Sequence, residues 1–448
     1  MENVLKIIEK LAIKHDKIPP ELIKAKNIKL GLRNEDGTGV FVGITSKGQV
    51  IGYKKEMLAD GSEKKIDLDG ELYYSGYNVE DLVKHQQKEG RFGFEETAYL
   101  LLTSELPTKK HLASFTLELA ERRYLPGEAK KIILNRPPHD DQMGSLHTIV
   151  SAMHLFDRNP NSTDLKDLAR QCIDLIAKFP TIVAYNYHAS ACRKKELSEL
   201  IEPREDYSHA ENFLYMLQGK KPDKLAAHLF DMMLVLHAEH GGGNNSTFTV
   251  RAVSSSGANS YMAICSGIAS LSGHLHGGAN EAVESMMENI KTQVKDWDDD
   301  EEISRYLRKI LDKKVGDKTG KIYGIGHAVY TKSDPRAVIL EHKAEEIAKK
   351  SGMLKEFTLH RKVAMLAPKI VLEKKGKVVS ANVDFYSGFV YRSMGIPKEL
   401  FTPIFAMSRV AGWSAHRIEE MVQGKLIRPS YVSSLPSLRS DYVPLASR

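Results

Sequence analysis

The stretch over residues 234–283 constrains this chain more than any other, because its polar residues do not have the spacing of a solvent-exposed surface. Apolar, glycine and other small residues surround four histidines here: His237, His240, His274 and His276. The apolar residues that lead into His237 predict a buried helix that ends at the glycines 241–243. Because residues three apart share one face of a helix, we expect His237 and His240 to face the same space. The glycines would let the backbone come close to a ligand held there.

The second half of this stretch predicts a helix over residues 261–271, followed by a glycine-rich turn and a new helix from Ala279. His276 would then lie beside a helix N-terminus, where the helix dipole disfavours a positively charged imidazole ring. A neutral imidazole in that place can donate a hydrogen bond to a carbonyl oxygen that gains negative charge. We therefore treat His276 as a candidate catalytic donor.

Two other interpretations of these histidines stay open. For His237 and His274, an equally good interpretation is that they are core residues whose ring nitrogens are hydrogen-bonded within the protein. A metal site is the weaker alternative, because no cysteine is nearby and Glu239 is the only adjacent carboxylate. The spacing of His237 and His240 also differs from that of zinc-binding HExxH helices. We expect no metal in this protein.

The overall composition is that of an ordinary globular protein, with 42% hydrophobic and 27% charged residues among 448. This length suffices for two domains, or for one large domain that carries an inserted lobe. The longest run of apolar and small residues, at 261–271, is about half as long as a membrane-spanning helix. The N-terminus predicts an amphipathic helix with Glu2 and Glu9 and no arginine-rich or serine-rich character. We therefore expect a cytoplasmic protein without a transit or signal peptide.

Charge and cysteine content exclude several classes of protein. The net charge of +6 is small for this length, and it suits an anionic small molecule as well as no charged ligand at all. Basic residues alternate with acidic ones and do not line up with aromatic residues, so we expect no nucleic-acid partner. The cysteines lack CxxC spacing and are expected to be reduced and unreactive: Cys172, Cys192 and Cys265.

The periodicity of the chain predicts its fold class. Residues 37–44 and 48–53 predict short strands of a small antiparallel patch. From Val79 almost to the end, the apolar residues have the period of helices, so the fold class is mostly α with a minor N-terminal antiparallel β patch. A charged segment lies between two more apolar parts of the chain. It predicts a small helical domain, 280–386, and a large helical domain formed by 1–279 and 387–448.

Prolines mark several expected helix boundaries. Pro180 predicts the first turn of a new helix, and Pro368 predicts a kink or a break. Thr402 and Pro403 predict the cap and the first residue of a helix that ends near position 411. A separate helix is predicted over 414–421.

Two segments outside the central stretch carry catalytic residue types in unusual settings. His327 follows the glycine turn 324–326, which would expose the imidazole among backbone amides. Asp384 is flanked by valine, phenylalanine and tyrosine, and apolar surroundings raise the basicity of a carboxylate. Such a carboxylate suits a general base that takes a proton from a weak carbon acid. The alternative for Asp384 is a helix cap for the segment that Phe385 opens.

Arginines at the ends of predicted elements stand in partly apolar surroundings: Arg336, Arg409 and Arg428. The planar guanidinium group can bind a carboxylate through two parallel hydrogen bonds. For each arginine alone, a surface position is the simpler explanation. One base, imidazole donors and arginines together fit one reaction class, in which a thioester or ketone is enolised and the enol attacks the carbonyl of a dicarboxylate.

The chain resembles the citrate synthase family in long motifs that follow one another in the family's order. The motifs around the candidate residues are HAEHGGGNNSTF, LHGGANE, GIGHAVY, DPRA and NVDFYSG. Further matching segments are ELYYSGY, EETAYLLL, AENFLYML and the terminal RPS, so the resemblance spans residues 68–430. The chain is similar in particular to the citrate and 2-methylcitrate synthases of bacteria.

The resemblance implies a mostly α-helical homodimer, with a large and a small domain that close over the substrates. It implies that oxaloacetate binds first. Acetyl-CoA is then deprotonated at its methyl group and condensed with oxaloacetate, and the citryl thioester is hydrolysed. Acetyl-CoA is a substrate of this reaction, and no further cofactor is implied.

The resemblance also assigns roles to the candidate residues. Asp384 resembles the catalytic base, His276 the donor that stabilises the acetyl-CoA enol, and His327 the group that polarises the oxaloacetate carbonyl. Five residues resemble the oxaloacetate ligands: His240, Asn244, Arg336, Arg409 and Arg428. Arg428 is expected to reach the active site of the partner subunit. Three residues are expected to contact coenzyme A: Gly324, Gly326 and Lys332.

Two departures from the family pattern concern coenzyme A. Thr331 stands where some members have a basic residue that meets CoA phosphates, and Lys332 is the nearest substitute. The 313–321 loop is longer and more charged than in many members. Both departures make the acyl-CoA preference uncertain from sequence, and the nearest rival function is 2-methylcitrate synthase, which uses propionyl-CoA. One extra methylene changes the binding free energy by only about 1–3 kcal/mol in an apolar pocket. A non-catalytic protein that keeps the fold is a second rival, against which the retained base and donors argue.

Overall fold

The structure is a computed structural model that describes residues 4–16, 18–59, 61, 63–191, 194, 196–434 and 441–447. The chain divides into two compact units, one from residues 1–43 and 427–448 and the other from residues 44–426. The predicted small domain, 280–386, lies wholly within the larger unit. Its independence as a domain stays a prediction.

The smaller unit contains the helices α1 (Val4–His15) and α2 (Pro20–Ala25). The predicted strand over 37–44 is wrong, because this segment forms no strand and pairs locally with residues 32–34. Arg33 and Gly39 form an isolated antiparallel bridge around a turn. In this turn Asp36 Oδ1 accepts a hydrogen bond from the backbone N–H of Thr38 at 2.8 Å. An aspartate that binds its own turn in this way competes with strand pairing.

A three-stranded antiparallel sheet opens the larger unit, with the order β1 (Gly48–Met57), β2 (Glu63–Tyr74) and β3 (Tyr77–Asn78). It confirms the predicted antiparallel patch. The pairing of β1 with β2 is irregular between Ile51 and Tyr53, whose partners are Glu71 and Asp67. At the end of β2 the buried Tyr74 donates a hydrogen bond from Oη to the carbonyl of Val235 at 3.0 Å. The hairpin is thereby fixed to the helix that leads into His237.

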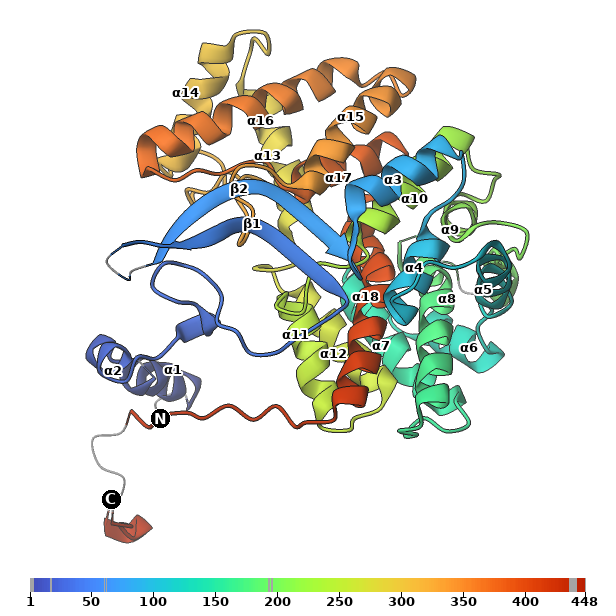
Figure 1. Ribbon diagram of the computed structural model, residues 1–448, viewed down its shortest axis with the longest axis horizontal. Helices are drawn as coiled ribbons and strands as arrows, with labels where there is room; N and C mark the ends of the chain where they lie inside the picture. The colour runs from blue at the N-terminus through green and yellow to red at the C-terminus, as the bar shows by residue number, and fades with distance from the viewer. Residues whose placement is uncertain are drawn as a thin grey trace. The chain divides into compact units, whose positions relative to one another are not determined.

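Helices form most of the larger unit, which confirms the mostly α fold class (Figure 1). The helices before residue 279, together with the long helix near the C-terminus, are α3 (Val79–Lys88), α4 (Phe94–Thr103), α5 (Lys109–Glu121), α6 (Gly127–Asn135), α7 (Gln142–Ala152), α8 (Leu165–Ser190), α9 (His209–Gln218), α10 (Lys224–His237), α11 (Asn245–Ser255), α12 (Ser260–Ser272) and α18 (Phe401–Gln423). α18 packs against α4, α8, α10, α11 and α12 and buries Trp413 completely, so it is the central helix of this body.

The remaining helices belong to the predicted small domain and its border, and Figure 1 shows them together at one end of the larger unit. They are α13 (Ala279–Gln293), α14 (Asp300–Leu311), α15 (Pro335–Lys350), α16 (Leu354–Lys375) and α17 (Val383–Ser393). α17 packs on α13 and α15, and α16 packs on α14 and α15. The predicted break at Pro368 is wrong, because α16 runs through this residue.

Three further predictions of helix boundaries are wrong. Pro180 lies inside α8, where it is buried, and does not begin a new helix. The helices predicted on either side of residue 412 are one helix, α18, with Gly412 in its interior. Thr402 does not cap it, since its Oγ1 donates to the carbonyl of Gly277 at 3.0 Å. Packing on neighbouring helices outweighs the cost of a proline or glycine inside a helix.

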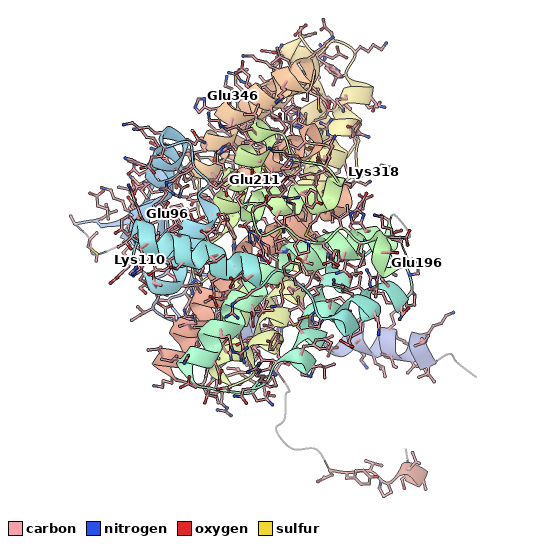
Figure 2. The ribbon with its side chains drawn as sticks, turned by 90° about the vertical axis from the view of Figure 1, so that its right-hand side faces the viewer. Glu96, Lys110, Glu196, Glu211, Lys318 and Glu346 are labelled. Carbon is pink, nitrogen blue, oxygen red and sulfur yellow. The ribbon has the colours of Figure 1, made fainter. Side chains whose placement is uncertain are left out.

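Charged side chains cover the outer faces of this unit, such as Lys110 on α5 and Glu346 on α15 in Figure 2. None of the described helices is both long enough and apolar enough to cross a membrane. Cys172 and Cys265 have buried free thiols, and burial raises their pKa to about 11 and about 12. Cys192 lies outside the described residues.

Candidate active site

The predicted site residues of the central stretch and of the His327 loop lie together. The rings of His240 and His327 meet edge to face with their centroids 5.0 Å apart. Tyr330 stacks on His327 at 4.7 Å and meets His240 edge-on at 5.5 Å. The prediction that His240 shares a helix face with His237 is wrong, because α10 ends at His237 and His240 lies beyond it.

The interpretation of His237 and His274 as hydrogen-bonded core residues is wrong for both. His274 is exposed. His237 is buried against Phe405, and neither of its ring nitrogens has a hydrogen-bond partner within the described ranges. Burial, reinforced by the charges of Arg336 and Arg409, holds the pKa of His237 well below its usual value. The ring is therefore neutral, and the backbone carbonyl of His237 accepts a hydrogen bond from Arg409 Nε at 2.7 Å.

His276 lies in the turn between α12 and α13, as predicted, and is half-buried. Its Nε2 is 3.1 Å from Ser246 Oγ, which also donates to Asn244 Oδ1 at 2.8 Å and accepts from Trp413 Nε1 at 3.3 Å. Burial, with the charge of Arg409, lowers the pKa of His276 to about 4. The imidazole is therefore neutral near pH 7, chiefly because of its burial.

His327 is held by its own loop. Its Nδ1 accepts hydrogen bonds from the backbone N–H groups of Val329 at 3.0 Å and Tyr330 at 3.1 Å. Since Nδ1 accepts, the proton of the neutral ring is on Nε2. The glycines before it have left-handed backbones, with φ of 73° at Gly324 and 101° at Gly326. A side chain at either position would strain this turn.

The turn before His327 is hydrogen-bonded to the segment before Asp384. Gly326 N–H donates to the carbonyl of Ser380 at 2.8 Å. Asn382 donates from its backbone N–H to the Gly324 carbonyl at 2.9 Å and from Nδ2 to the Gly326 carbonyl at 2.8 Å. The two segments are therefore one local structure, although they are far apart in sequence.

Asp384 is half-buried in the first turn of α17. The alternative that it caps this helix is wrong, because Asn382 is the N-cap and its Oδ1 accepts from the Asp384 N–H at 3.0 Å. Burial raises the pKa of Asp384 from 3.8 to about 6; Asp334 adds to the rise, and Arg336 and Arg409 oppose it. The carboxylate is a stronger base than an exposed aspartate and is still mostly ionised near pH 7.

Arg336 and Arg409 are both buried but are paired differently. Arg336 binds the buried Asp334 through Nε at 3.0 Å and Nη2 at 2.8 Å. This pairing outweighs burial and raises the pKa of Arg336. Arg409 has no ion pair within the described part of the chain, its Nη1 has no partner there, and burial lowers its pKa to about 10. It remains a cation at neutral pH.

Comparison with known proteins identifies the family of this site. The family model "Citrate synthase, C-terminal domain" matches residues 49–430, which is most of the chain. The chain belongs to the citrate synthase family. It is an enzyme of the acyltransferase class with citrate synthase activity.

Individual members of the family match over most of their length. The citrate synthase of Deinococcus radiodurans is 41% identical over 339 residues, which are 75% of this chain and 84% of that protein. The 2-methylcitrate synthase of Shewanella oneidensis is 34% identical over 84% of this chain and 92% of its own. The citrate synthase of Thermoplasma acidophilum, solved in a ternary complex with carboxymethyl coenzyme A and oxaloacetate, is 28% identical with a TM-score of 0.75. That match covers 94% of this chain and 99% of the other.

Sequence reasoning missed a buried group of charged and polar side chains around Glu239, next to His240. Glu239 Oε1 accepts from His416 Nε2 at 2.9 Å, and Arg251 donates to His416 Nδ1 at 2.9 Å. The pKa of Glu239 lies below its usual value. Burial alone would raise it, but His416, Arg409 and the Gly241 N–H stabilise the carboxylate by more. A Cβ atom at Gly48 would lie 2.6 Å from Oε1 of Glu239, and one at Gly412 would lie 2.3 Å from Oε2.

The two glycines thus leave room for the Glu239 carboxylate. The only signal in the sequence was a charged residue inside an apolar run. Asp334, the partner of Arg336, was visible as part of the DPRA motif but was not singled out.

The predicted substrate contacts of Arg428 and Lys332 stay predictions. Arg428 belongs to the smaller unit, whereas the other predicted site residues belong to the larger one. Lys332 is exposed, and Thr331 Oγ1 donates to the Gly52 carbonyl at 3.4 Å. The charged 313–321 loop, whose Lys318 is labelled in Figure 2, has a left-handed backbone at Lys318.

A cavity of the larger unit lies apart from the predicted site residues. A cavity of about 300 Å³ lies between α3, α10 and α15, lined among others by Gln86, His228 and Lys343. None of the predicted site residues lines this cavity. In the part of the chain that the structure describes, no cluster of three or more His, Cys, Asp or Glu side chains is arranged to hold a metal ion.

Proposed function

We propose that the residues around His240 and Asp384 condense acetyl-CoA with oxaloacetate and then hydrolyse the citryl-CoA thioester. One observation carries this assignment of substrate. Arg409 Nη1 and His240 Nε2 are buried polar atoms without a partner among the described residues. Such atoms are normally satisfied. Burial, reinforced by Arg336, holds the pKa of His240 well below its usual value, and a guanidinium group together with a neutral imidazole fits a carboxylate. Oxaloacetate, which was bound to the Thermoplasma enzyme, has two carboxylates.

In this proposal the dicarboxylate is bound by side chains that differ in charge. Arg409 supplies an unpaired cation, and Arg336 supplies the guanidinium edge that Asp334 does not occupy. His240 and Asn244 donate neutral hydrogen bonds. Burial strengthens each of these interactions, because the effective dielectric constant is lower than in water.

Asp384 removes a proton from the methyl group of acetyl-CoA, and the electron pair of that C–H bond forms the enol. His276 donates from Nδ1–H to the oxygen that gains negative charge. This donation requires Nε2 to accept a hydrogen bond, so the Ser246 hydroxyl, whose Oγ lies 3.1 Å from Nε2, turns its single proton from Asn244 Oδ1 to Nε2. A neutral imidazole donor avoids a fixed positive charge next to the base.

The enol carbon then attacks the carbonyl carbon of oxaloacetate, and a new carbon–carbon bond forms as the carbonyl oxygen takes up the electron pair. His327 donates to this oxygen through Nε2–H, because Nδ1 is occupied by the two backbone N–H groups. Water subsequently attacks the citryl thioester, the C–S bond breaks, and citrate and CoA–SH leave.

Release of free thiol from acetyl-CoA tests this function. We expect thiol to appear only when oxaloacetate is present, and a chelator to have no effect on the rate. Thiol release without oxaloacetate, or none with it, would contradict the proposal.

Propionyl-CoA is the second candidate acyl donor, because a 2-methylcitrate synthase is 34% identical to this chain. A single methylene changes binding by only about 1–3 kcal/mol, so both substrates are compatible with one set of catalytic residues. Steady-state kinetics with both acyl-CoAs decides between them. We expect the larger kcat/KM with acetyl-CoA, and a larger value with propionyl-CoA would reverse the assignment.

The contacts to coenzyme A are also part of this proposal. The backbone of Gly324 and Gly326 would lie against coenzyme A, and Lys332 would bind its phosphates. Replacing Lys332 by alanine should raise the KM for acetyl-CoA and leave that for oxaloacetate unchanged. Equal effects on both substrates would remove Lys332 from this role.

Closure of the 280–386 lobe is part of the same proposal. His327 and Asp384 lie in this lobe, whereas His240 and Arg409 lie outside it, so a dicarboxylate that bridges both sets favours a closed state. Small-angle scattering should give a smaller radius of gyration with saturating oxaloacetate. An unchanged radius would count against closure.

A cytoplasmic homodimer in which Arg428 serves the partner's site completes the proposal. Co-refolding Asp384→Asn with Arg428→Ala chains tests this role of Arg428. If Arg428 acts across the dimer, about a quarter of wild-type activity should return, since half of the dimers are mixed and each has one intact site. If it acts within its own chain, the mixture stays inactive.

A further inference from the structure

The irregular part of the β1–β2 hairpin lies against the backbone of the His327 loop. Between the pairs Ile51–Glu71 and Tyr53–Asp67, β2 contains more residues than β1, and this irregularity includes Gly52 and Gly70. Irregularities of this kind bend a strand locally and change the direction in which its backbone faces. Here the two glycines both face the segment that follows His327.

The contacts at both glycines are too close for any side chain. A Cβ atom at Gly52 would lie 2.4 Å from the carbonyl oxygen and 2.9 Å from the carbonyl carbon of Val329. A Cβ atom at Gly70 would lie 2.2 Å from the carbonyl oxygen of Ser333. Neither glycine has a left-handed backbone, so the space at these positions, not the φ angle, requires glycine.

The two contacts hold different parts of the loop. Val329 and the residue after it donate the N–H groups that bind His327 Nδ1, so a shift of Val329 away from Gly52 would lengthen those bonds. Thr331 Oγ1 donates to the Gly52 carbonyl at 3.4 Å and binds the same strand. The Gly52 contact therefore lies directly behind the donors that fix the imidazole.

Gly70 holds the next part of the loop. Its N–H donates to Ser333 Oγ at 3.0 Å, and Ser333 precedes Asp334, which binds Arg336 through both carboxylate oxygens. Asp334 Oδ2 also accepts from the Val383 N–H at 3.2 Å, at the start of the helix that carries Asp384. A shift of Ser333 would therefore move the carboxylate that orients Arg336.

We propose that the β1–β2 irregularity is a positioning element of the active site. In this proposal Gly52 keeps the imidazole proton of His327 on Nε2, and Gly70 holds the Asp334–Arg336 ion pair in place. The hairpin contacts neither substrate in this proposal. Its effect on kinetics rests on the proposed function, whereas its effect on the His327 ring does not.

Alanine variants at the two glycines test the proposal, with Gly127→Ala as the matched control. Gly127 begins α6, has an ordinary backbone, and has no atom within 4 Å of the position of a Cβ. Imidazole ¹⁵N spectra of histidine-labelled protein, assigned with His327→Gln, report which ring nitrogen carries the proton. We expect the wild type and Gly127→Ala to have the His327 proton on Nε2, and Gly52→Ala to have it distributed over both nitrogens.

Kinetics should separate the two glycines. Gly52→Ala should lower kcat by about ten- to a hundredfold, because a small misplacement of a catalytic group has effects of this size. Gly70→Ala should raise the KM for oxaloacetate by about tenfold or more and leave the KM for acetyl-CoA within about twofold, because it acts through Arg336. Gly127→Ala should leave every constant unchanged.

Milder variants keep the test decisive if an alanine variant does not fold. Thr331→Val and Ser333→Ala each remove one hydrogen bond to the hairpin, and we expect changes of about two- to tenfold in the same constants. An unchanged His327 spectrum and unchanged kcat in Gly52→Ala, or in Thr331→Val if Gly52→Ala does not fold, would overturn the proposal. A wild type without oxaloacetate-dependent thiol release, combined with the expected spectral change, would instead overturn the proposed function alone.

Discussion

The start of α17 and the turn between α12 and α13 show how one environment produces two different reagents. Burial raises the pKa of Asp384 to about 6 and lowers that of His276 to about 4. The direction differs because burial disfavours the charged form, which is the deprotonated aspartate and the protonated histidine. Arg409 lowers the pKa of both groups. Shared burial therefore produces both a base and a neutral donor, and Arg409 reinforces the effect of burial on His276 while it opposes that effect on Asp384.

The largest expected effect concerns the aspartate. Asp384→Asn should lower kcat by about two to four orders of magnitude, because removing a general base has costs of this size. Substrate binding and the unfolding temperature should change little, since asparagine has nearly the same shape. Steady-state kinetics and thermal unfolding measure both. Near-normal turnover in this variant would break the comparison, because Asp384 would not be the base.

The shared cation gives the next largest effect. Removing one partner of a buried charge pair costs roughly 2–5 kcal/mol, so Arg409→Ala should raise the KM for oxaloacetate by about thirtyfold or more. The KM for acetyl-CoA should change far less. Arg417→Ala is the matched control, because Arg417 is buried in the same helix with its Nε bound to Ser260 Oγ and is not one of the predicted site residues. Equal changes for both substrates in Arg409→Ala would contradict its role.

Of the two groups compared, only Asp384 should make kcat/KM depend on pH. A base works when deprotonated, so kcat/KM should fall by about tenfold between about pH 7 and pH 5 as Asp384, with a pKa of about 6, takes up its proton. His276, with a pKa of about 4, stays neutral over this range and should contribute nothing. The residual activity of Asp384→Asn should lack this decrease. An unchanged decrease in that variant would assign the titration to another group.

The smallest effect should come from the support of His276. Ser246→Ala removes the hydroxyl at its Nε2, which also contacts Asn244 and Trp413, and the loss of the bond to His276 alone is worth about 0.5–1.5 kcal/mol, or about two- to tenfold in kcat. Ser272→Ala is the control, because this exposed serine donates only to the Ala269 carbonyl. A Ser246→Ala enzyme with wild-type kcat would show that His276 does not need a donor at Nε2.

Local patterns in the sequence predicted features that depend on neighbouring residues. The 3.6-residue period predicted the helical fold class, and the apolar neighbours of Asp384 predicted a raised pKa. The glycines before His327 predicted a turn with available backbone amides. Each of these follows from a few consecutive residues, so no knowledge of distant contacts was needed.

Features that depend on distant contacts were not predictable in this way. Pro180 is a helix breaker by its chemistry, but packing of α8 keeps it inside the helix. The break predicted between residues 411 and 414 is absent, and Gly412 leaves room there for Glu239 and for the Ala238 carbonyl. The low pKa of His276 comes from burial and from the charge of Arg409, and both depend on residues that are distant in the sequence. The roles assigned to the site residues stay predictions until the variants above are measured.

The space around Glu239 has a consequence for how this enzyme can vary. Gly48 and Gly412 come from distant parts of the chain, yet each touches a different oxygen of one carboxylate. A Cβ atom at Gly412 would also lie 2.4 Å from the Ala238 carbonyl oxygen, so a shorter side chain at Glu239 relieves the close contact at Gly48 but not the one at Gly412. Positions 48 and 239 therefore form one unit of covariation, whereas Gly412 is required independently. A double-mutant cycle of Gly48→Ala with Glu239→Ala should show favourable coupling in the free energy of unfolding, and additive changes would show that the positions vary independently.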